Sequence, residues 1–360
     1  MKQLKKLATL LASGLAVAAI TAGSAQAEPL KVGFVYVGSV GDYGWNYAHN
    51  RGRLALEEAL GDKVKTSYVE NVAEGPDAQR VITQLANTGH DLIFTTSFGF
   101  MNPTLRVAKD FPNVKFEHAT GFKRADNLAT YSARFYEGRH IAGIISGKMT
   151  KTGNIGYIAS FPIPEVIRGI NAATIAARSV NPNAKMKVIW VSTWGDPGKE
   201  ADAAKTLIDQ GVDVIMQHTD SPAAVRVAEE RGVYAFGQAS DMVAFGPKAH
   251  LTAIIDNWDP YYIARAKAAM DGTWTSTDTW GGFKSGMVVM SPYNPAIPGN
   301  VVALAEAARK GIIDGSVHPF AGPLKDQAGK IVVEAGKNAE DGMLLGMNFY
   351  VEGVEGKIPQ

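Results

Sequence analysis

The sequence predicts an α/β protein with two doubly wound parallel-sheet lobes. Short apolar segments alternate with helical segments, the alternation occurs in both halves of the chain, and the composition is mixed throughout the 360 residues. Short buried strands separated by amphipathic helices are typical of a parallel sheet that is covered on both faces. A chain of this length is better divided between two compact domains than built around one core.

The first half of the chain shows the alternation from its first apolar segment onward. We expect strands over 30–37, 64–69, 92–95, 114–118 and 128–132, and helices over 51–60, 77–88, 103–110 and 137–148.

The second half repeats this plan and then continues into a further strand at 251–256. We expect strands over 154–159, 187–194, 214–218 and 234–238, and helices over 164–179, 198–210 and 222–231. We expect the crossing between the lobes at Lys151, Thr152 and Gly153. The strand at 251–256 follows a loop with glycine and proline, so we expect the chain to return to the first lobe there.

These segments define the expected domains. We expect a signal peptide at 1–27, a first lobe made of 28–149 and about 250–283, a second lobe made of 150–249 and about 284–325, and a C-terminal segment at 326–360 that packs at the hinge.

The first 27 residues predict export. Lys2, Lys5 and Lys6 precede an apolar run at 7–20, and small residues end at Ala25-Gln26-Ala27. The apolar run is shorter than the roughly 20 residues that span a bilayer, so cleavage after Ala27 is favoured over a membrane helix. Because the chain has no cysteine, we expect no disulfide, no thiolate metal site and no lipid anchor. We therefore expect a freely diffusing periplasmic protein and a monomer.

The charge balance excludes a nucleic-acid partner. The full chain has 36 basic and 35 acidic residues, and removal of three lysines leaves 33 against 35, a net charge of −2. Such a chain has no basic field for phosphate groups.

The most informative stretch is the glycine-rich turn at 37–52, which follows the first strand and opens a helix. Its glycines allow the backbone to approach a ligand closely. Asp42, Trp45 and Asn46 offer a carboxylate, a flat apolar ring and an amide, and Tyr43 lies beside them. The alternative is an ordinary turn in which Asp42 caps the helix and Trp45 packs in the core.

Further candidate side chains follow other strands, where ligands of open α/β sheets bind. Trp194 could close on the opposite face of a planar ligand from Trp45, because stacking a base on an aromatic ring contributes about 1–3 kcal/mol. Asp241 and Asp256 could accept ring N–H, amino or sugar O–H donors. Each aromatic ring could equally pack in the core. The strand-end residues are Ser97, Phe98, Phe100, Phe161, Pro162, Trp194, His218, Asp220, Gln238, Ser240, Asp241, Asp256, Asn257 and Trp258.

No catalytic or metal motif accompanies these residues. The sequence contains no nucleophile elbow that could form a catalytic triad with His218. It also contains neither a metal-binding histidine spacing nor a phosphate-binding loop motif. A flat, uncharged nitrogen heterocycle fits the set best, and no cofactor is expected.

Six motifs resemble the basic membrane protein family of ABC-transporter substrate-binding proteins over essentially the whole mature chain. They are Gly-Asp-Tyr-Gly-Trp-Asn (41–46), Asp-Leu-Ile-Phe-Thr-Thr-Ser-Phe (91–98), Phe-Pro-Ile-Pro-Glu-Val-Ile-Arg (161–168), Asp-Pro-Gly-Lys (196–199), Gly-Val-Tyr-Ala-Phe-Gly (232–237) and Ser-Asp (240–241). The resemblance implies a type I periplasmic-binding fold with hinge crossings, no catalysis, and capture of purine nucleosides or related heterocycles for a permease in the inner membrane.

The resemblance also implies roles for three residues. In nucleoside-binding members an aromatic ring from each lobe sandwiches the base, which corresponds to Trp45 and Trp194 here, and the Ser-Asp carboxylate, Asp241, holds ribose. Many members have a sugar-contacting lysine where this chain has Asp256. This departure points to a free purine base such as adenine or guanine. A purine nucleoside, a flavin-like ligand, a secreted nucleoside hydrolase and a sensor ectodomain are the alternatives.

Overall fold

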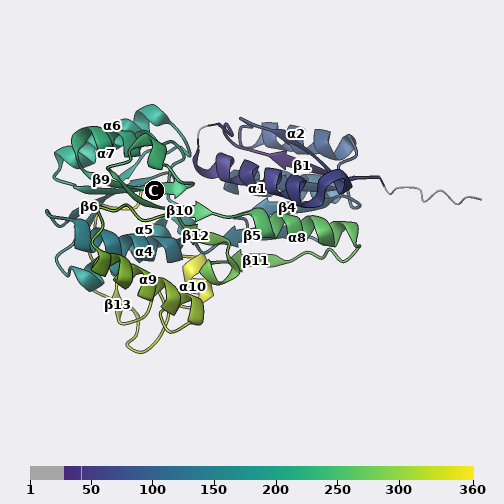
Figure 1. The fold of residues 1–360 in the computed structure, drawn as a ribbon. Coiled ribbons are helices and arrows are strands. Elements are labelled where there is room, and N and C mark those ends of the chain that lie inside the picture. Colours follow the sequence, from purple (N-terminus) through teal and green to yellow (C-terminus); the bar gives the residue numbers. More distant parts are fainter. Residues whose placement is uncertain (1–27, 42) are drawn as a thin grey trace, which may run out of the picture.

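The computed structural model describes residues 28–41 and 43–360, so the predicted signal peptide at 1–27 and Asp42 lie outside the described residues. The chain forms two α/β lobes side by side, each built around its own sheet (Figure 1). Within the described ranges, no helix is long and apolar enough to cross a membrane.

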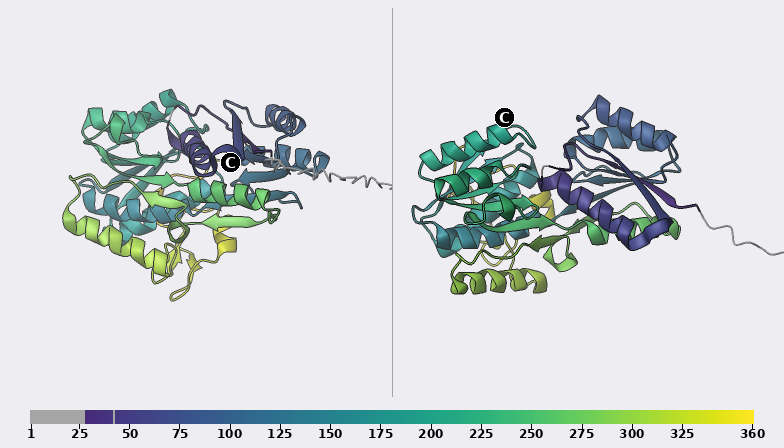
Figure 2. Two further views of the ribbon diagram at one scale, coloured as in Figure 1. Left: turned by 45° about the vertical axis from the view of Figure 1, so that its right-hand side comes forward. Right: turned by 45° about the horizontal axis from the view of Figure 1, so that its top comes forward.

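The first lobe contains a six-stranded sheet in the order β11-β5-β4-β3-β1-β2, and every pairing in it is parallel. Helices α1 and α8 pack together on one face and α2 and α3 on the other, as two further views show (Figure 2). The elements are β1 (Leu30–Val35), α1 (Gly44–Leu60), β2 (Val64–Val69), α2 (Pro76–Asn87), β3 (Leu92–Thr95), α3 (Met101–Asp110), β4 (Lys115–Ala119), β5 (Leu128–Ala133), α8 (Asp259–Met270) and β11 (Asp278–Gly281).

The second lobe contains a seven-stranded sheet in the order β12-β10-β9-β8-β6-β7-β15, in which β12 alone pairs antiparallel among the described strands. Helices α4, α5 and α9 lie on one face and α6 and α7 on the other (Figure 1). The elements are α4 (Phe135–Met149), β6 (Asn154–Ala159), α5 (Pro164–Val180), β7 (Lys185–Trp190), α6 (Pro197–Asp209), β8 (Val214–Gln217), α7 (Ala223–Arg231), β9 (Tyr234–Ala239), β10 (His250–Asp256), β12 (Val288–Met290) and α9 (Gly299–Asp314).

Short elements complete the chain after α9 and at several loops. These are the 3-10 turns η1 (Gly61–Lys63), η2 (Phe98–Phe100), η3 (Val243–Phe245) and η4 (Phe283–Ser285), together with β13 (Leu324–Lys325), β14 (Ile331–Val333), α10 (Asp341–Leu345) and β15 (Val354–Glu355).

Both sheets have the doubly wound strand order, which confirms the predicted fold class. In the first sheet β1 lies between β2 and β3, and in the second β6 lies between β7 and β8. The chain changes direction across the sheet at β1/β3 and β6/β8, and ligands of such sheets bind outside the carboxyl ends of strands at these points. The two lobes therefore each contribute one expected binding edge.

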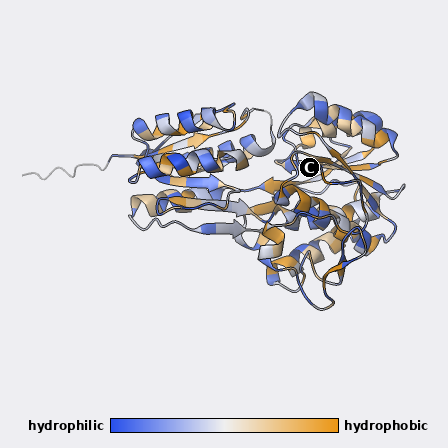
Figure 3. Ribbon diagram, turned by 180° about the vertical axis from the view of Figure 1, so that it is seen from behind, coloured by the Kyte–Doolittle hydropathy of each residue, from blue (hydrophilic) through white to orange (hydrophobic). Residues whose placement is uncertain are grey.

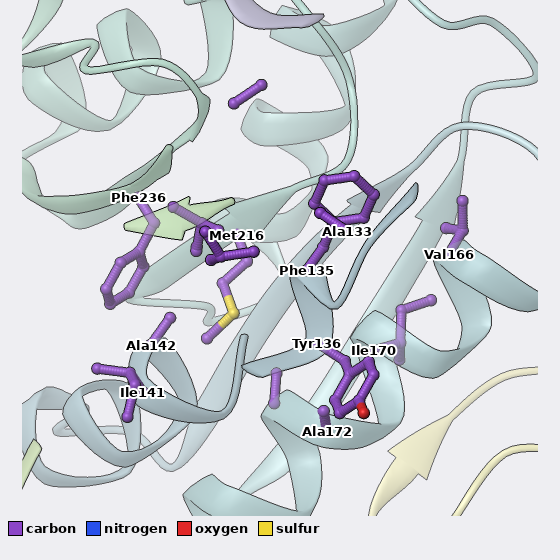
Figure 4. Close-up of a cluster of buried hydrophobic side chains, with 14 of the residues drawn as sticks. Ala133, Phe135, Tyr136, Ile141, Ala142, Val166, Ile170, Ala172, Met216 and Phe236 are labelled. Carbon is purple, nitrogen blue, oxygen red and sulfur yellow. The ribbon is translucent and has the colours of Figure 1, made fainter. Parts of the chain in front are cut away.

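Apolar side chains line the sheet strands and the inner faces of the helices, while the outer helix faces are hydrophilic (Figure 3). In the second lobe, Phe236 and Met216 from the sheet lie near Ile141 and Ala142 of α4, and Ile170 of α5 lies near Tyr136 (Figure 4). Burying a side chain of this size contributes about 1.5–3 kcal/mol to the stability of the folded protein. This packing fixes the strands whose ends form the binding edge.

Helix α4 belongs to the second lobe, whereas the prediction placed 137–148 in the first. It packs most extensively against α5 and also contacts α9 and β10. A Cβ at Gly143 would lie 2.3 Å from the carbonyl oxygen of Ala173 in α5, so this glycine allows the two helices to touch. The first crossing between lobes is therefore at Arg134, not at 151–153.

Strand β10 also differs from the prediction, which returned 251–256 to the first lobe. It pairs parallel with β9 and antiparallel with β12 in the second sheet. Its residues are buried, with one exception of intermediate exposure, so it is a central strand of that sheet. The chain returns to the first lobe after Asp256 and crosses again between β11 and β12.

The C-terminal segment contacts both a crossing and the outer edge of the second sheet. Arg134, at the first crossing, donates to both carboxylate oxygens of Asp341 at 2.9 and 2.7 Å. The same guanidinium lies 4.1 Å from the ring centre of Trp280, which precedes the third crossing. Strand β15 then pairs with β7. The segment expected at the hinge thus contacts the first crossing at Arg134 and extends to the outer edge of the second sheet.

Candidate functional site

A small cavity lies between the lobes where the two binding edges meet. Its volume is about 30 Å³, and chambers of about 380 and 400 Å³ adjoin it and share parts of its wall. The lining residues follow strands of both sheets. They are Val37, Trp45, Ser97, Phe98, Thr120, Glu165, Trp194, His218, Asp220 and Gln238.

Trp45 is held firmly by the first lobe. Its indole N–H donates to the carbonyl of Thr96 at 2.6 Å. Its ring meets His49 and Trp258 edge to face, with centroid distances of 4.3 and 5.6 Å. Because the ring is only half-buried, one part of it faces the cavity. The strand β1, the turn and the start of α1 together aim this ring at the cleft.

Trp194 belongs to the loop after β7 and faces the same cavity from the second lobe. Its ring lies 4.9 Å from that of Phe161, at an interplanar angle of 58°. Its backbone carbonyl accepts a hydrogen bond from the Asp220 N–H at 3.0 Å. Rings from opposite lobes therefore border one cavity, an arrangement that can hold a planar ligand by stacking.

The polar part of the wall combines acceptors with a fixed donor. Glu165 Oε1 lies 3.4 Å from Nε2 of His218. Burial lowers the pKa of His218, although the nearby Glu165 raises it in part, so the imidazole is neutral at pH 7. Arg139 donates to Oε1 of Gln238, which leaves the Gln238 amide N–H groups to meet a ligand. The wall can thus form hydrogen bonds with both donor and acceptor groups on the edge of a heterocycle.

His118 supports this wall from behind. It is fully buried, and its Nε2–H donates to the carbonyl of Ser97 at 2.8 Å. Burial lowers the pKa of His118 to about 4, while the hydrogen bond to Ser97 acts in the opposite direction. The folded protein therefore keeps this imidazole neutral at pH values where the unfolded chain protonates it.

We expect His118→Gln, which keeps a donor for Ser97, to reduce the acid sensitivity of the fold. In the wild type, the contribution of His118 to stability is present above pH 6.5 and is lost as the pH falls toward about 4. At about 1.4 kcal/mol per pH unit, the loss between pH 6.5 and 5 is about 2 kcal/mol. Urea unfolding of the wild type and the variant at pH 7.5 and 5 measures this loss of unfolding free energy. A difference between the two proteins that is the same at both pH values would contradict this assignment.

The start of α1 reaches across the cleft to the second lobe. The Gly44 N–H donates to Ser240 Oγ at 2.8 Å, and the Trp45 N–H donates to Asp220 Oδ1 at 3.3 Å. The Asn46 amide donates to the other Asp220 oxygen at 3.3 Å. Trp45 is therefore fixed at its backbone by the lobe that also presents Trp194.

The structure brings together three predicted site residues, Trp45, Phe98 and Trp194, around the cavity. Tyr43 and Asn46 line the adjoining chamber of about 380 Å³ instead. Asn46 is engaged by protein partners, because its Oδ1 also accepts the Gly38 N–H at 3.2 Å.

Asp241 and Asp256 line a different crevice, between α1 and the ends of β9 and β10. Asp241 accepts the Val243 N–H at 3.0 Å. Asp256 is 4% exposed, and neither of its oxygens has a hydrogen-bond partner among the described atoms. Burial raises the pKa of Asp256 well above its usual value, and the charges of Glu165 and Asp220 add to this while Arg139 opposes it. Asp256 is therefore electrostatically coupled to the cavity that contains those acids.

Sequence reasoning missed two wall residues, Thr120, which directly follows β4, and Glu165. Glu165 lies in the first turn of α5, directly after the loop that follows β6, so its position at a strand end was available as a signal. Asp220 and Gln238 were recognised as strand-end residues, but nothing in the sequence ranked them above Asp241. Within the described ranges, no group of three histidine, aspartate or glutamate side chains is arranged to hold a metal ion.

Comparison with known proteins identifies the family. The family described as ABC transporter substrate-binding protein PnrA-like matches residues 30–314. A Brucella abortus (strain 2308) protein named purine-binding protein is 58% identical over 339 residues, which are 94% of this chain and 97% of that protein. A Haloferax volcanii protein, provisionally named an ABC transporter glucose-binding protein, is 38% identical over 94% of this chain and 83% of its own length.

Solved structures show the same fold. The crystal structure of an ABC transporter solute-binding protein from Aeropyrum pernix K1 superposes with a TM-score of 0.70 at 21% sequence identity, covering 82% of this chain and 94% of that one. The predicted family, the type I periplasmic-binding fold and a binding rather than a catalytic role are thereby confirmed. The chain belongs to the PnrA-like family of ABC transporter substrate-binding proteins.

Proposed function

We propose that this protein captures a purine nucleobase in the periplasm, between its two lobes, and delivers it to an ABC permease in the inner membrane. The observation that carries the proposal is the pair of rings, Trp45 and Trp194, which border one cavity from opposite lobes. A purine offers two flat faces for such rings and a polar edge for Glu165, His218 and Gln238. The Brucella abortus relative, named purine-binding protein, supports the same ligand class.

The size of the cavity requires a movement of the lobes before a ligand can enter. A volume of about 30 Å³ is far below the roughly 300 Å³ at which small-molecule pockets begin, so the lobes must move apart to admit a ligand. Preferential binding to the closed arrangement then stabilises closure, which is the change that a permease can recognise.

Asp256 supports a base rather than a nucleoside. A buried carboxyl group without a partner costs free energy until a donor reaches it. A free base has a ring N–H where a nucleoside carries its sugar, and this N–H can donate to an oxygen of a carboxyl group. We assign Trp45, Trp194 and Phe98 to the stacking wall and Glu165, His218 and Gln238 to the polar edge. Asp256 lines the neighbouring crevice, and we propose that a donor of the base reaches it when the lobes rearrange around the ligand.

A purine nucleoside is the second candidate, because one adjoining chamber suits a sugar. The chamber of about 380 Å³ is lined by Asn71, Glu74, Ser192 and Thr193, among others, and these offer acceptors and donors for hydroxyl groups. A ribose attached to a base between the rings could extend into it.

Titration calorimetry of refolded, ligand-stripped protein tests both candidates. Adenine, guanine, hypoxanthine, adenosine, guanosine, riboflavin and glucose are compared at equal concentrations. We expect saturable one-to-one binding of a base and at least tenfold weaker binding of its nucleoside. The reverse preference would select the nucleoside, and binding of glucose or riboflavin alone would overturn the purine assignment. Size-exclusion chromatography with light scattering checks the expected monomer.

A further inference from the structure

We infer that Asp220 is a positioning residue that sets the spacing of the two stacking tryptophans by capping helix α1 from the opposite lobe. The inference concerns the same site as the proposed function and rests on it for the identity of the ligand. The contacts that support it belong to the protein alone.

Among the described residues, helix α1 has no side-chain cap from its own N-cap residue. The residue before it, Tyr43, has φ 62° and ψ −165° and makes no side-chain capping hydrogen bond. The first N–H groups of a helix have no partner within the helix and are normally satisfied by a side chain just before it. Here the partners come from the second lobe, because Gly44 donates to Ser240 and Trp45 donates to Asp220.

The charge of Asp220 suits this position. The helix dipole places a partial positive charge at the N-terminus of α1, which favours a nearby carboxylate. Both carboxylate oxygens are used, one by the Trp45 N–H and the other by the Asn46 side-chain amide. Hydrogen bonds to an ionised acceptor are stronger than those between neutral groups. Opening the cleft would expose the uncapped end of α1 to water.

Asp220 also connects the two rings. Its carboxylate accepts from the backbone of Trp45, and its own N–H donates to the backbone carbonyl of Trp194 at 3.0 Å. One residue therefore joins the backbones of both tryptophans, which come from different lobes. The distance between the Trp45 and Trp194 rings depends on this link. A ligand can stack on both rings only if that distance allows it to contact both at once.

The backbone around Asp220 is braced within the second lobe. Glu200 Oε2 accepts the Ser221 N–H at 3.1 Å and the Ser221 hydroxyl at 2.7 Å. The adjacent Gln217 amide donates to the carbonyls of Thr219 and Ser221 at 2.9 and 2.8 Å. Asp220 is thus presented on a rigid loop, as a positioning role requires.

The experiment measures lobe closure separately from affinity. Because the chain has no cysteine, Lys109→Cys in the first lobe and Glu230→Cys in the second provide a specific pair of spin-label sites. Lys109 and Glu230 are both exposed, so a label can be attached at each. Distance distributions by double electron–electron resonance are recorded for the labelled parent, Asp220→Ala, Asp220→Asn and the control Asp202→Ala, each with and without adenine. Asp202 is an exposed acid of the same lobe that forms an ion pair with Lys205 at 3.4 Å.

We expect Asp220→Ala to shift the distances to longer values without and with adenine, and to weaken adenine binding at least tenfold. Asp220→Asn keeps an acceptor for the Trp45 N–H and should recover part of both effects, whereas Asp202→Ala should match the parent. Thermal unfolding confirms that each variant is folded. Distance distributions that coincide for the parent and both Asp220 variants would overturn the inference, even if affinity falls, because Asp220 would then act only through direct ligand contact. If the parent binds no purine, the proposed function fails, while the distances without ligand still test Asp220.

Discussion

Replacing Gly44 with alanine is expected to weaken ligand binding by at least 100-fold while leaving both lobes folded. A Cβ at this position would lie 2.3 Å from the backbone oxygen of Asp220 in the other lobe, a distance that real Cβ contacts essentially never reach. Since the obstacle is backbone, no side-chain rotation relieves it. The variant must hold the lobes apart at the point where Trp45 and Trp194 face one ligand.

The backbone conformation adds a second cost that needs its own control. Gly44 has φ +68°, a left-handed conformation that costs a residue with a Cβ about 1–2 kcal/mol. Gly61, at the other end of α1, has φ +51°, and a Cβ added there would meet no atom within 4 Å. Gly61→Ala therefore carries the conformational cost without the steric one. We expect this variant to lower the melting temperature but to bind like the wild type.

Calorimetry and small-angle scattering distinguish the two effects of Gly44→Ala. Scattering with saturating ligand should show a larger radius of gyration than for the wild type, and calorimetry should show the lost affinity. If Gly44→Ala binds as tightly as Gly61→Ala, the close contact between α1 and the second lobe is not part of the binding-competent state.

Removing either stacking ring is expected to give the second-largest effect. A base stacked on an aromatic ring gains about 1–3 kcal/mol, so Trp45→Ala and Trp194→Ala should each raise the dissociation constant by about 5- to 150-fold. Trp194→Phe keeps a ring at the same place and should recover most of the affinity. Fluorescence or calorimetric titration measures each constant.

The two tryptophans should differ in their effect on stability. Trp45 packs against Trp258 and His49 and donates to Thr96, so its loss also removes contacts within the first lobe. Trp194 has one ring neighbour, Phe161, among the described aromatic contacts, so its loss should change the melting temperature little. Trp190→Ala is the control, because Trp190 bonds to Tyr350 away from the cavity. Unchanged affinity in both ring variants would contradict the stacking site.

The sequence was sufficient for the fold because its signals are local. Each strand and each helix can be recognised from the residue pattern within its own segment. Strands such as Asn154–Ala159 and Val64–Val69 have the predicted bounds. Trp45, Phe98 and Trp194 could be chosen because parallel strands present their carboxyl ends at one edge. These inferences need no knowledge of which lobe a segment joins.

The errors concern contacts between distant segments. Helix α4 is buried at nearly every position, so it has no polar face that would indicate the lobe it packs against. Strand β10 is buried and has a central apolar stretch, a pattern that suits the interior of either sheet. Asp256 lies beside the binding edge, yet its carboxylate lines a crevice next to Asp241. The link between Asp220 and α1 joins residues about 175 positions apart, and no local pattern predicts it.

The three crossings also determine how the protein can assemble during synthesis. The sheet of the first lobe includes β11, which is made after most of the second lobe, and the sheet of the second lobe includes β15, which is made after α9 and α10. Neither sheet can be completed from a continuous stretch of chain, so the usual order in which an N-terminal domain folds before the next one is synthesised is not available. Such long-range pairing slows folding. The first lobe is therefore incompletely folded until β11 has been made, and the second until β15 has been made.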